Sequence, residues 1–486
     1  MVFSSLVFLY AFFPLSLLAY ALFRSQRAKN AALLIFSLIF YAWGEPVYVF
    51  LLMFMALCSW LCALGISRAE NRTRAKLWVA VAAVIDIALI GFFKYAGMFC
   101  GILGAVPDFI TRIALPIGIS FYTFQLLTYV VDVYRGDAAA QKSYWNVLLY
   151  ASLFHQCIAG PIVRYKTIGN ELFGDTRRQH DWAGGISRFA IGLGKKVLLA
   201  NPCGALADSL LLSDKTLADG LLFAQNMDKL GTMPVLGLWL GVIAYTLQIY
   251  LDFSAYSDMA IGMGRMLGLH YPENFKYPYI SRSVTEFWRR WHISLGTFFR
   301  DYVYIPLGGN RCGKLRWVFN TLVVWALTGL WHGASWNFVL WGLWCFVFMM
   351  LEKAFLGKLL KKLPVLSNLY LLFVSCLGWV IFRFTNMELG GTVLSGLFGL
   401  GGNPLSDFYT LTTLKNNVWL LLVCILACTP LPAMLGKRIS ARLKNRPLGH
   451  GVCDAVQYAV LPIALLLLST AALVAGSYNP FIYFQF

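Results

Sequence analysis

Two histidines stand in sequence contexts where an imidazole could transfer protons. His332 lies in GLWHGASWNF (329–338), between two glycines and two tryptophans and within a long apolar stretch. Burying an ionisable side chain at membrane depth is costly, so a functional role is the default expectation for such a residue. Desolvation favours the neutral imidazole, which accepts a proton from an attacking hydroxyl. We therefore predict that His332 is a general base.

A structural role for His332, as a hydrogen-bond partner of a neighbouring helix, is the alternative. Gly329 and Gly333 are expected to weaken the helix around it, and Ser335 and Asn337 to supply polar groups beside the ring. The sequence has no GxSxG motif that would offer a competing serine nucleophile. Base catalysis on a bound acyl donor is therefore favoured over a covalent serine mechanism.

The apolar stretches on both sides of His332 must position it. Residues 317–331 and 338–351 are nearly all apolar. Fifteen helical residues rise only about 22 Å, less than the hydrocarbon core of roughly 30 Å. Residues 317–352 are therefore expected to form a hairpin whose turn, with His332 in it, lies deep in the membrane. Basic clusters before and after the hairpin predict that both of its ends face the cytoplasm.

His292 follows a pair of arginines in the basic segment 265–316, which we call the platform. The platform carries nine Lys or Arg against three acidic residues. Ser283 and Glu286 form a capping-box pattern, and the apolar and basic residues after them segregate at helical spacing, which predicts an amphipathic helix at the cytoplasmic interface. At about 100° per residue, His292 falls roughly 80° from the centre of the apolar stripe. Anionic lipid headgroups and a cytosolic polyanion, such as coenzyme A or the phosphopantetheine arm of a carrier protein, both fit this charge.

The composition is that of an integral membrane protein. Of 486 residues, 59% are hydrophobic and 13% are charged, and apolar runs of spanning length recur throughout. The net charge of +18 lies in short clusters between these runs, so it indicates a lipid bilayer as partner and not nucleic acid. The eleven cysteines show no paired CxxC motifs, and neither a zinc site, another metal site nor a disulfide framework is predicted.

The basic clusters predict the topology. They put the N-terminus outside and give about ten to twelve spans, with a tight turn at residues 44–46. Residues 153–165 and 186–202 are too short or too broken by Gly, Pro and charge to be regular spans, which predicts re-entrant backbone around an internal cavity. Residues 1–486 are expected to form one transmembrane domain. The clusters predicted to be cytoplasmic are Arg24, Arg27 and Lys29; Arg68, Arg72, Arg74 and Lys76; Lys353, Lys358, Lys361 and Lys362; and Lys437, Arg438, Arg442, Lys444 and Arg446.

Motifs along most of the chain resemble the membrane-bound O-acyltransferase family, and within it the branch of alginate O-acetyltransferase membrane subunits. The resemblance implies an all-α ring of transmembrane helices, with re-entrant segments and cytoplasmic amphipathic helices, around a central tunnel. His155 is a departure, because a proline would be expected there. The motifs are LPIGISFYTFQLLTYVVDVYRG (115–136), CIAGPIVRY (157–165), LQIYLDFSAYSDMAIGMGRMLG (247–268), EFWRRWHISLGTFFRDYVYIPLGGNR (286–311), LTGLWHGASWNF (327–338) and YNPFIYF (478–484).

The resemblance also implies roles for individual residues. His332 would be catalytic at the constriction of the tunnel, and His292 would be a second catalytic residue on its cytosolic side. Acetyl-CoA is the implied acyl donor, a substrate, and no tightly bound cofactor is expected. The donor would contact Trp288, Arg289, Arg290 and Arg300, and the tunnel would be lined by Trp331, Ser335, Trp336, Asn337 and His155.

The implied reaction is O-acetylation of an exported or cell-wall polysaccharide at the bacterial inner membrane. The acetyl group would pass to an extracytoplasmic partner, an SGNH-type acetyltransferase. Two alternatives stay open: D-alanyl transfer from a carrier-protein thioester to teichoic acid, and a non-enzymatic transporter or flippase, which broken helices and a basic entrance would also suit. The YIPLGGNR motif and the YNPFIYF ending favour polysaccharide acetylation.

Overall fold

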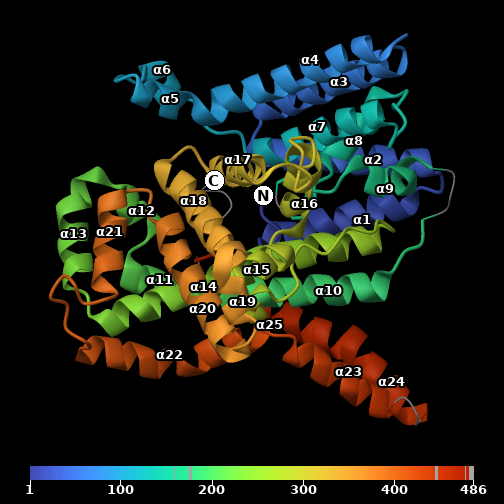
Figure 1. Cartoon of the computed structure of the whole chain (residues 1–486). Coiled ribbons are helices and arrows are strands. Elements are labelled where there is room, and N and C mark those ends of the chain that lie inside the picture. The colour runs from blue at the N-terminus through green and yellow to red at the C-terminus, as the bar shows by residue number, and fades with distance from the viewer. Residues whose placement is uncertain (159, 175–177, 444–446, 477, 481–486) are drawn as a thin grey trace. The chain divides into compact units, whose positions relative to one another are not determined.

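The regular secondary structure is all helical in the part of the chain that the structure describes. The computed structural model describes residues 1–486 apart from 159, 175–177, 444–446, 477 and 481–486, and no strand occurs among the described residues (Figure 1). Seven helices in this part are long and apolar enough to cross a bilayer. This confirms the expected all-α polytopic membrane fold. The seven are Tyr48–Ser67, Arg72–Ile102, Val235–Met266, Trp336–Leu360, Pro364–Arg383, Phe408–Ala427 and Gly449–Ala475.

The other expected spans correspond to helices that are shorter or more polar, such as α2 (Gln26–Gly44) and α7 (Ile119–Arg135). The higher span count, the ring and the central tunnel therefore stay predictions. Lys444 and Arg446 of the last basic cluster lie outside the described residues, as does the second half of the closing motif.

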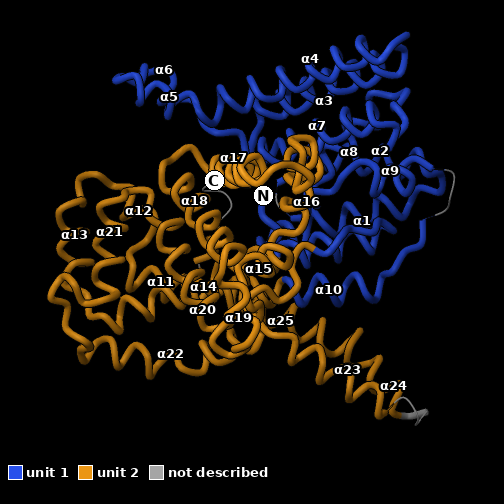
Figure 2. Tube along the Cα trace, viewed as in Figure 1, with its two compact units in different colours: residues 1–192, 256–273 blue, residues 193–255, 274–486 orange. Residues whose placement is uncertain are grey.

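The chain divides into two compact units (Figure 2). Unit 1 comprises residues 1–192 and 256–273, and unit 2 comprises residues 193–255 and 274–486. The long helix α14 (Val235–Met266) contributes to both. His292 and His332 belong to unit 2, and His155 belongs to unit 1. The expectation of one transmembrane domain stays a prediction.

Unit 1 shows the turn and the broken segment that the sequence predicts. Helix α2 ends at Gly44 and α3 begins at Tyr48, so the GEP sequence forms the turn. The described residues of 153–164, which leave out 159, contain no helix, as expected for a broken segment. The other helices that begin in unit 1 are α1 (Phe13–Leu22), α4 (Arg72–Ile90), α5 (Ala96–Ile102), α6 (Asp108–Thr111), α8 (Tyr144–Ser152), α9 (Tyr165–Phe173) and α10 (Trp182–Gly194).

The second segment that we expected to be broken is instead helical. Residues 182–211 run through α10, a π-helical turn and α11 (Asn201–Leu211). Pro202, which has no backbone N–H to donate, follows the π-helical turn over 195–200, where the regular α-helical hydrogen bonding has already changed. The charge of Lys196 is balanced within unit 2, because its Nζ lies 2.8 Å from Asp252 Oδ1. Neither the proline nor the buried lysine therefore interrupts the helix.

Unit 2 contains the expected hairpin. Helix α17 (Lys314–His332) and α18 (Trp336–Leu351) are joined by residues 333–335. The remaining helices of unit 2 are α12 (Asp214–Ala218), α13 (Phe223–Thr232), α15 (Val284–Arg290), α16 (Ile293–Phe299), α19 (Gly357–Leu360), α20 (Pro364–Arg383), α21 (Met387–Gly396), α22 (Phe408–Ala427), α23 (Leu431–Leu443), α24 (Pro447–Ala455) and α25 (Leu461–Ala475).

Of the two glycines that we expected to weaken the helix around His332, Gly329 does not interrupt it, whereas α17 does end immediately before Gly333. Helix α17 continues through Gly329 to His332. A Cβ added at Gly329 would lie 2.3 Å from the Phe338 carbonyl oxygen, and one at Gly342 would lie 2.4 Å from the Trp325 carbonyl oxygen. Gly329 and Gly342 therefore let the backbones of α17 and α18 touch, which is how small residues act in membrane helix packing.

The platform helix is not continuous, so the expectation of one amphipathic helix is wrong. Ser283 caps α15 as predicted, with its Oγ accepting from Glu286 N at 3.0 Å. The Glu286 carboxylate accepts from Arg282 N, one residue before the cap. The chain then breaks at His292, whose φ of 43° and ψ of 53° lie in the left-handed region. This conformation is uncommon for a residue other than glycine, and it turns α16 away from α15.

Candidate active site around two buried histidines

The His332 ring lies in a cage of aromatic side chains. It is the last residue of α17 and is 4% exposed. Its ring centre lies 5.0 Å from that of Trp341 on α18 and 5.2 Å from that of Phe382 on α20, both at nearly right angles. A Cβ added at the next residue, Gly333, would lie 2.2 Å from the Phe338 ring, so only glycine fits there. Three helices of unit 2 therefore fix the imidazole in an apolar setting.

His292 is also buried, which agrees with its predicted position at the edge of the apolar stripe, from which it can face the protein. The Asn274 side chain holds the turn, because its Oδ1 accepts from Ser294 N at 3.0 Å and from Ser294 Oγ at 2.9 Å. The His292 Nδ1 lies 3.3 Å from the same oxygen. Phe253 covers the ring at a centroid distance of 4.7 Å. Burial lowers the pKa of His292 to about 3, so the imidazole is neutral at physiological pH.

Trp331 connects the two histidines through ring contacts. Its ring centre lies 5.6 Å from that of His292 and 4.9 Å from that of His332. Its side chain is buried, as expected for a residue inside the protein. The two imidazoles thus share one neighbour.

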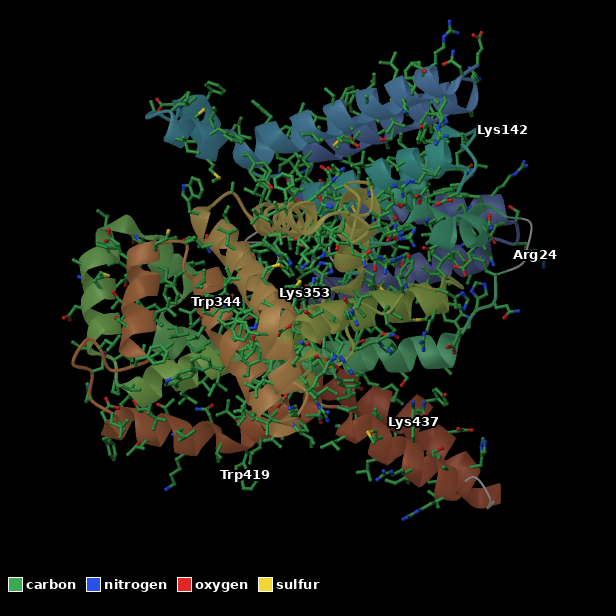
Figure 3. The ribbon with its side chains drawn as sticks, in the orientation of Figure 1. Arg24, Lys142, Trp344, Lys353, Trp419 and Lys437 are labelled. Atoms are coloured by element: carbon green, nitrogen blue, oxygen red, sulfur yellow. The ribbon has the colours of Figure 1, made fainter. Side chains whose placement is uncertain are left out.

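A cavity of about 650 Å³ opens between the platform helices and the hairpin. His292 lies in its wall, and so does Thr328, which precedes His332 by four residues, or about 6 Å of helix rise. The cavity carries three cationic side chains, from Arg289, Arg300 and Lys353; Lys353 is labelled in Figure 3. Its lining is Thr285, Trp288, Arg289, His292, Ile293, Leu295, Gly296, Thr297, Phe299, Arg300, Tyr304, Thr321, Val324, Trp325, Thr328, Met349 and Lys353.

Three of the four residues predicted to contact a donor line this cavity, namely Trp288, Arg289 and Arg300. Arg290, the fourth, does not. Its guanidinium lies 2.8 Å from Glu286 Oε1 and donates to the Lys276 carbonyl oxygen. The break at His292 separates Arg289 and Arg290 from the rest of the expected helix. Of these two arginines, only Arg289 lines the cavity.

The residues predicted to line a tunnel are more scattered. Trp336 is 54% exposed, and it lines none of the cavities described here. Asn337 is buried, but its amide donates to the Ile381 and Phe382 carbonyl oxygens of α20 and not toward His332. Ser335 is partly buried at the start of α18. His155 lies in unit 1, where its Nδ1 is 2.5 Å from Tyr271 Oη.

Several residues of the site were not singled out from the sequence. Asn274 lies 18 residues before His292 and carries no local signal of its role. Lys353 was identified only as part of a cytoplasmic cluster. Glu352, its neighbour, accepts from Thr285 N at 3.1 Å and from Thr285 Oγ1 at 2.9 Å, and it also accepts from Val284 N. A carboxylate at the N-terminus of α15 stabilises the helix that carries Trp288 and Arg289.

The site is suited to anion binding and proton transfer. Its charged side chains are cations, its histidines are enclosed by aromatic rings, and one imidazole is held neutral. Within the described ranges, no group of three His, Cys, Asp or Glu side chains is placed to hold a metal ion. The fold and the site together define a multi-pass membrane protein with a basic cavity that leads toward buried histidines.

Comparison with known proteins identifies the family. The family model of membrane-bound O-acyltransferases matches residues 35–390. A probable alginate O-acetylase of Azotobacter vinelandii is 36% identical over 100% of both chains. A peptidoglycan O-acetyltransferase of Helicobacter pylori is 30% identical over 100% of this chain and 98% of its own. More distant is a teichoic acid D-alanyltransferase of Bacillus subtilis, 27% identical over 55% of this chain and 68% of its own.

The chain therefore belongs to the membrane-bound O-acyltransferase family. It is an acyltransferase and a multi-pass protein of the bacterial inner membrane, as the sequence motifs implied. Membership of this family excludes the alternative that the chain is a non-enzymatic transporter or flippase.

Proposed function

We propose that this acyltransferase moves an acetyl group from cytosolic acetyl-CoA across the membrane for O-acetylation of a polysaccharide. The observation that carries this proposal is the basic cavity, which has His292 in its wall and ends one helical turn from His332. The acetyl group and the polysaccharide are taken from the names of the relatives that match over the whole chain.

The cavity has the size and charge for a nucleotide thioester. Its volume of about 650 Å³ is within the usual range of small-molecule sites, about 300–1,000 Å³. Arg300 is already paired with Asp301, its Nε lying 2.7 Å from Oδ1, so Arg289 and Lys353 supply most of the unbalanced charge. Trp288 and Trp325 offer aromatic surface for a base. We propose that the phosphates of acetyl-CoA contact Arg289 and Lys353, and that its acetyl group lies near Thr328.

In the proposed reaction His332 acts as the general base. The hydroxyl oxygen of the acceptor attacks the thioester carbonyl carbon, and its proton passes to the neutral imidazole of His332. The new C–O bond forms, the C–S bond breaks, and the proton is returned to the leaving thiolate, which departs as the thiol of coenzyme A. The aromatic rings around His332 favour the uncharged imidazole before the reaction. They also exclude water, which would hydrolyse the thioester.

His292 is assigned a positioning role. Asn274 Oδ1 is an acceptor, so the His292 tautomer that fits this contact carries its proton on Nδ1 and a lone pair on Nε2. This contact fixes the orientation of the His292 ring in the cavity wall, where the ring helps to position the donor substrate. We propose that the acetyl group then reaches the polysaccharide through an extracytoplasmic acetyltransferase partner.

The D-alanyl alternative is less well supported, because the relative with that name matches only about half of this chain. A direct test distinguishes the donors. Purified protein is incubated with radiolabelled acetyl-CoA and, separately, with a D-alanyl carrier protein. We expect acetyl-CoA to bind with an affinity that falls with salt, as phosphate contacts to cations do. Binding of the carrier protein alone would refute the proposed donor.

The catalytic residue is tested in cells that produce the polysaccharide. The cells carry wild-type protein, His332→Ala or His450→Ala, and the ester content of their exported and cell-wall glycans is measured by mass spectrometry. His450 is an exposed histidine that pairs with Asp454, so it controls for loss of an imidazole elsewhere. We expect esters to disappear only in His332→Ala, with equal protein in the membrane. Full ester content in that variant would refute the role of His332.

A further inference from the structure

Unit 1 holds a second and larger cavity, which the proposed reaction does not use. Its volume is about 1,380 Å³, and it lies where α1 and α2 meet α8 and α9. We call it the basic groove. Its lining is Ala21, Phe23, Arg24, Gln26, Arg27, Lys29, Asn30, Ala31, Leu34, Ile35, Ser143, Trp145, Asn146, Leu149, Leu172, Phe173, Gly174, Arg178 and His180.

The lining of the groove carries four cationic side chains. They belong to Arg24, Arg27, Lys29 and Arg178, and among the described lining residues there is no carboxylate. Arg24 and Arg27 are exposed, and within the described residues neither forms an ion pair (Figure 3 labels Arg24). Lys29 Nζ lies 4.9 Å from the centre of the Tyr20 ring. The groove thus carries four cations in its lining.

One of these cations, Arg178, is buried and held in a fixed position by hydrogen bonds. It is 6% exposed, and its guanidinium is held by neutral acceptors: the Glu171 and Leu172 carbonyl oxygens at 2.8 and 3.1 Å, Tyr20 Oη at 3.1 Å and Asn30 Oδ1 at 2.5 Å. None of these acceptors neutralises it. A buried charge is normally balanced by an opposite charge, and an anion bound in the groove would supply one.

The groove also has exposed apolar side chains in its lining. Phe23, Ile35 and Trp145 are 45%, 57% and 58% exposed, and they lie beside the partly buried Leu34 and the buried Leu149. Tryptophan beside cationic side chains is typical of the boundary between lipid headgroups and acyl chains. A free nucleotide would leave this apolar wall in water, whereas a lipid would cover it.

We propose that the basic groove binds one anionic glycerophospholipid. The phosphate is held by Arg24, Arg27 and Arg178, and the acyl chains lie along Ile35 and Trp145. The sequence placed the first two arginines in a cytoplasmic cluster, so the lipid belongs to the inner leaflet. The same four cations would repel a zwitterionic headgroup's ammonium and so select for net negative charge.

The test uses the purified full-length protein, stripped of lipid in detergent. Native mass spectrometry measures binding of dioleoyl phosphatidylglycerol and of dioleoyl phosphatidylcholine, which differ only in the headgroup. The test variant is Arg24→Ala/Arg27→Ala, which leaves buried Arg178 intact. The control is Arg68→Ala/Lys76→Ala, which removes the same charge from exposed residues of unit 1 outside the groove.

We expect one phosphatidylglycerol molecule to bind the wild-type protein in clear preference to phosphatidylcholine. Each basic residue near an anionic lipid contributes about fivefold in affinity, so the test variant should lose roughly 30-fold and the control little. Equal affinity for the two lipids, or equal loss in both variants, would overturn the proposal. If coenzyme A displaces phosphatidylglycerol from the wild-type protein, the groove is a nucleotide site and the lipid assignment is wrong.

Discussion

Replacing Gly342 by alanine should separate α17 from α18 and displace His332. A Cβ at this position would lie 2.4 Å from the Trp325 carbonyl oxygen, whereas ordinary van der Waals contacts begin at 3.4 Å. The obstacle is backbone, so the two helices must move apart by about 1 Å. We expect an overpacking cost of roughly 1–3 kcal/mol in the free energy of unfolding.

The same movement should act on catalysis more than on donor binding. His332 ends α17 and packs on Trp341, the neighbour of Gly342, so the displacement reaches the imidazole directly. Misplacing a catalytic group by about 1 Å lowers the rate roughly 100-fold. The KM for acetyl-CoA should rise as well, because Trp325 and Thr328 on α17 line the cavity, but by less than kcat falls, because Trp288 and Arg289 lie on α15.

The assay is steady-state acetyl transfer by purified protein, with the Tm measured in parallel. Gly391→Ala is the matched control, because no atom lies within 4 Å of a Cβ added in that helix. It should keep the wild-type rate and Tm, or gain slightly in stability from the higher helix propensity of alanine. Wild-type kcat in Gly342→Ala would refute the argument that glycine contacts position His332.

Three further predictions concern the cavity wall. Asn274→Ala removes the acceptor of two Ser294 hydrogen bonds, so it should lower both Tm and kcat, with a loss of about 1–3 kcal/mol in the free energy of unfolding. Unchanged values would show that Asn274 does not hold the turn. Arg289→Ala should raise the KM for acetyl-CoA about fivefold, while Arg290→Ala, outside the cavity, should not; equal effects would contradict the cavity assignment. Burial lowers the pKa of His292 from 6.5 to about 3, so its ring stays neutral as the pH falls from roughly 8 to 5. His292→Gln should therefore lower kcat without moving the midpoints of its pH profile, and loss of a midpoint in this range would contradict the neutral ring.

Local patterns in the sequence predicted much of the fold. The all-helical membrane architecture followed from the apolar runs, and the hairpin followed from two such runs around His332. The Ser283 cap depends on residues three apart, and the structure shows it. Each of these features is determined by neighbouring residues along one helix.

Features that depend on distant residues were missed. The break at His292 is held by Asn274, and helical spacing alone gives no sign of it. In the sequence of a single helix, Gly329 and Gly342 would be expected to lower helix stability. Their role as contact points with the backbone of the other helix is visible only in the structure. His180 stands in a polar stretch of sequence that is typical of a solvated loop, yet it is partly buried, with its Nδ1 3.0 Å from the Met266 carbonyl oxygen.

The candidate site was predictable in its residue types more than in its geometry. Both histidines and Trp288, Arg289 and Arg300 were identified from their motif, and the last three do line the cavity. The motif gave no means to tell Arg289 from Arg290, because which of two adjacent side chains faces a cavity depends on where the helix ends. Lys353 joins the site only through the fold of the hairpin.

The central claim is that His332 takes the proton from the acceptor while the basic cavity holds the donor. It is tested most directly by measuring both steps on purified His332→Ala protein, with coenzyme A binding by calorimetry and acetyl transfer under single-turnover conditions. Loss of the base should leave the Kd for coenzyme A unchanged and lower the transfer rate by about 10²- to 10⁴-fold. Transfer at the wild-type rate, or an equal loss of binding and transfer, would contradict the claim.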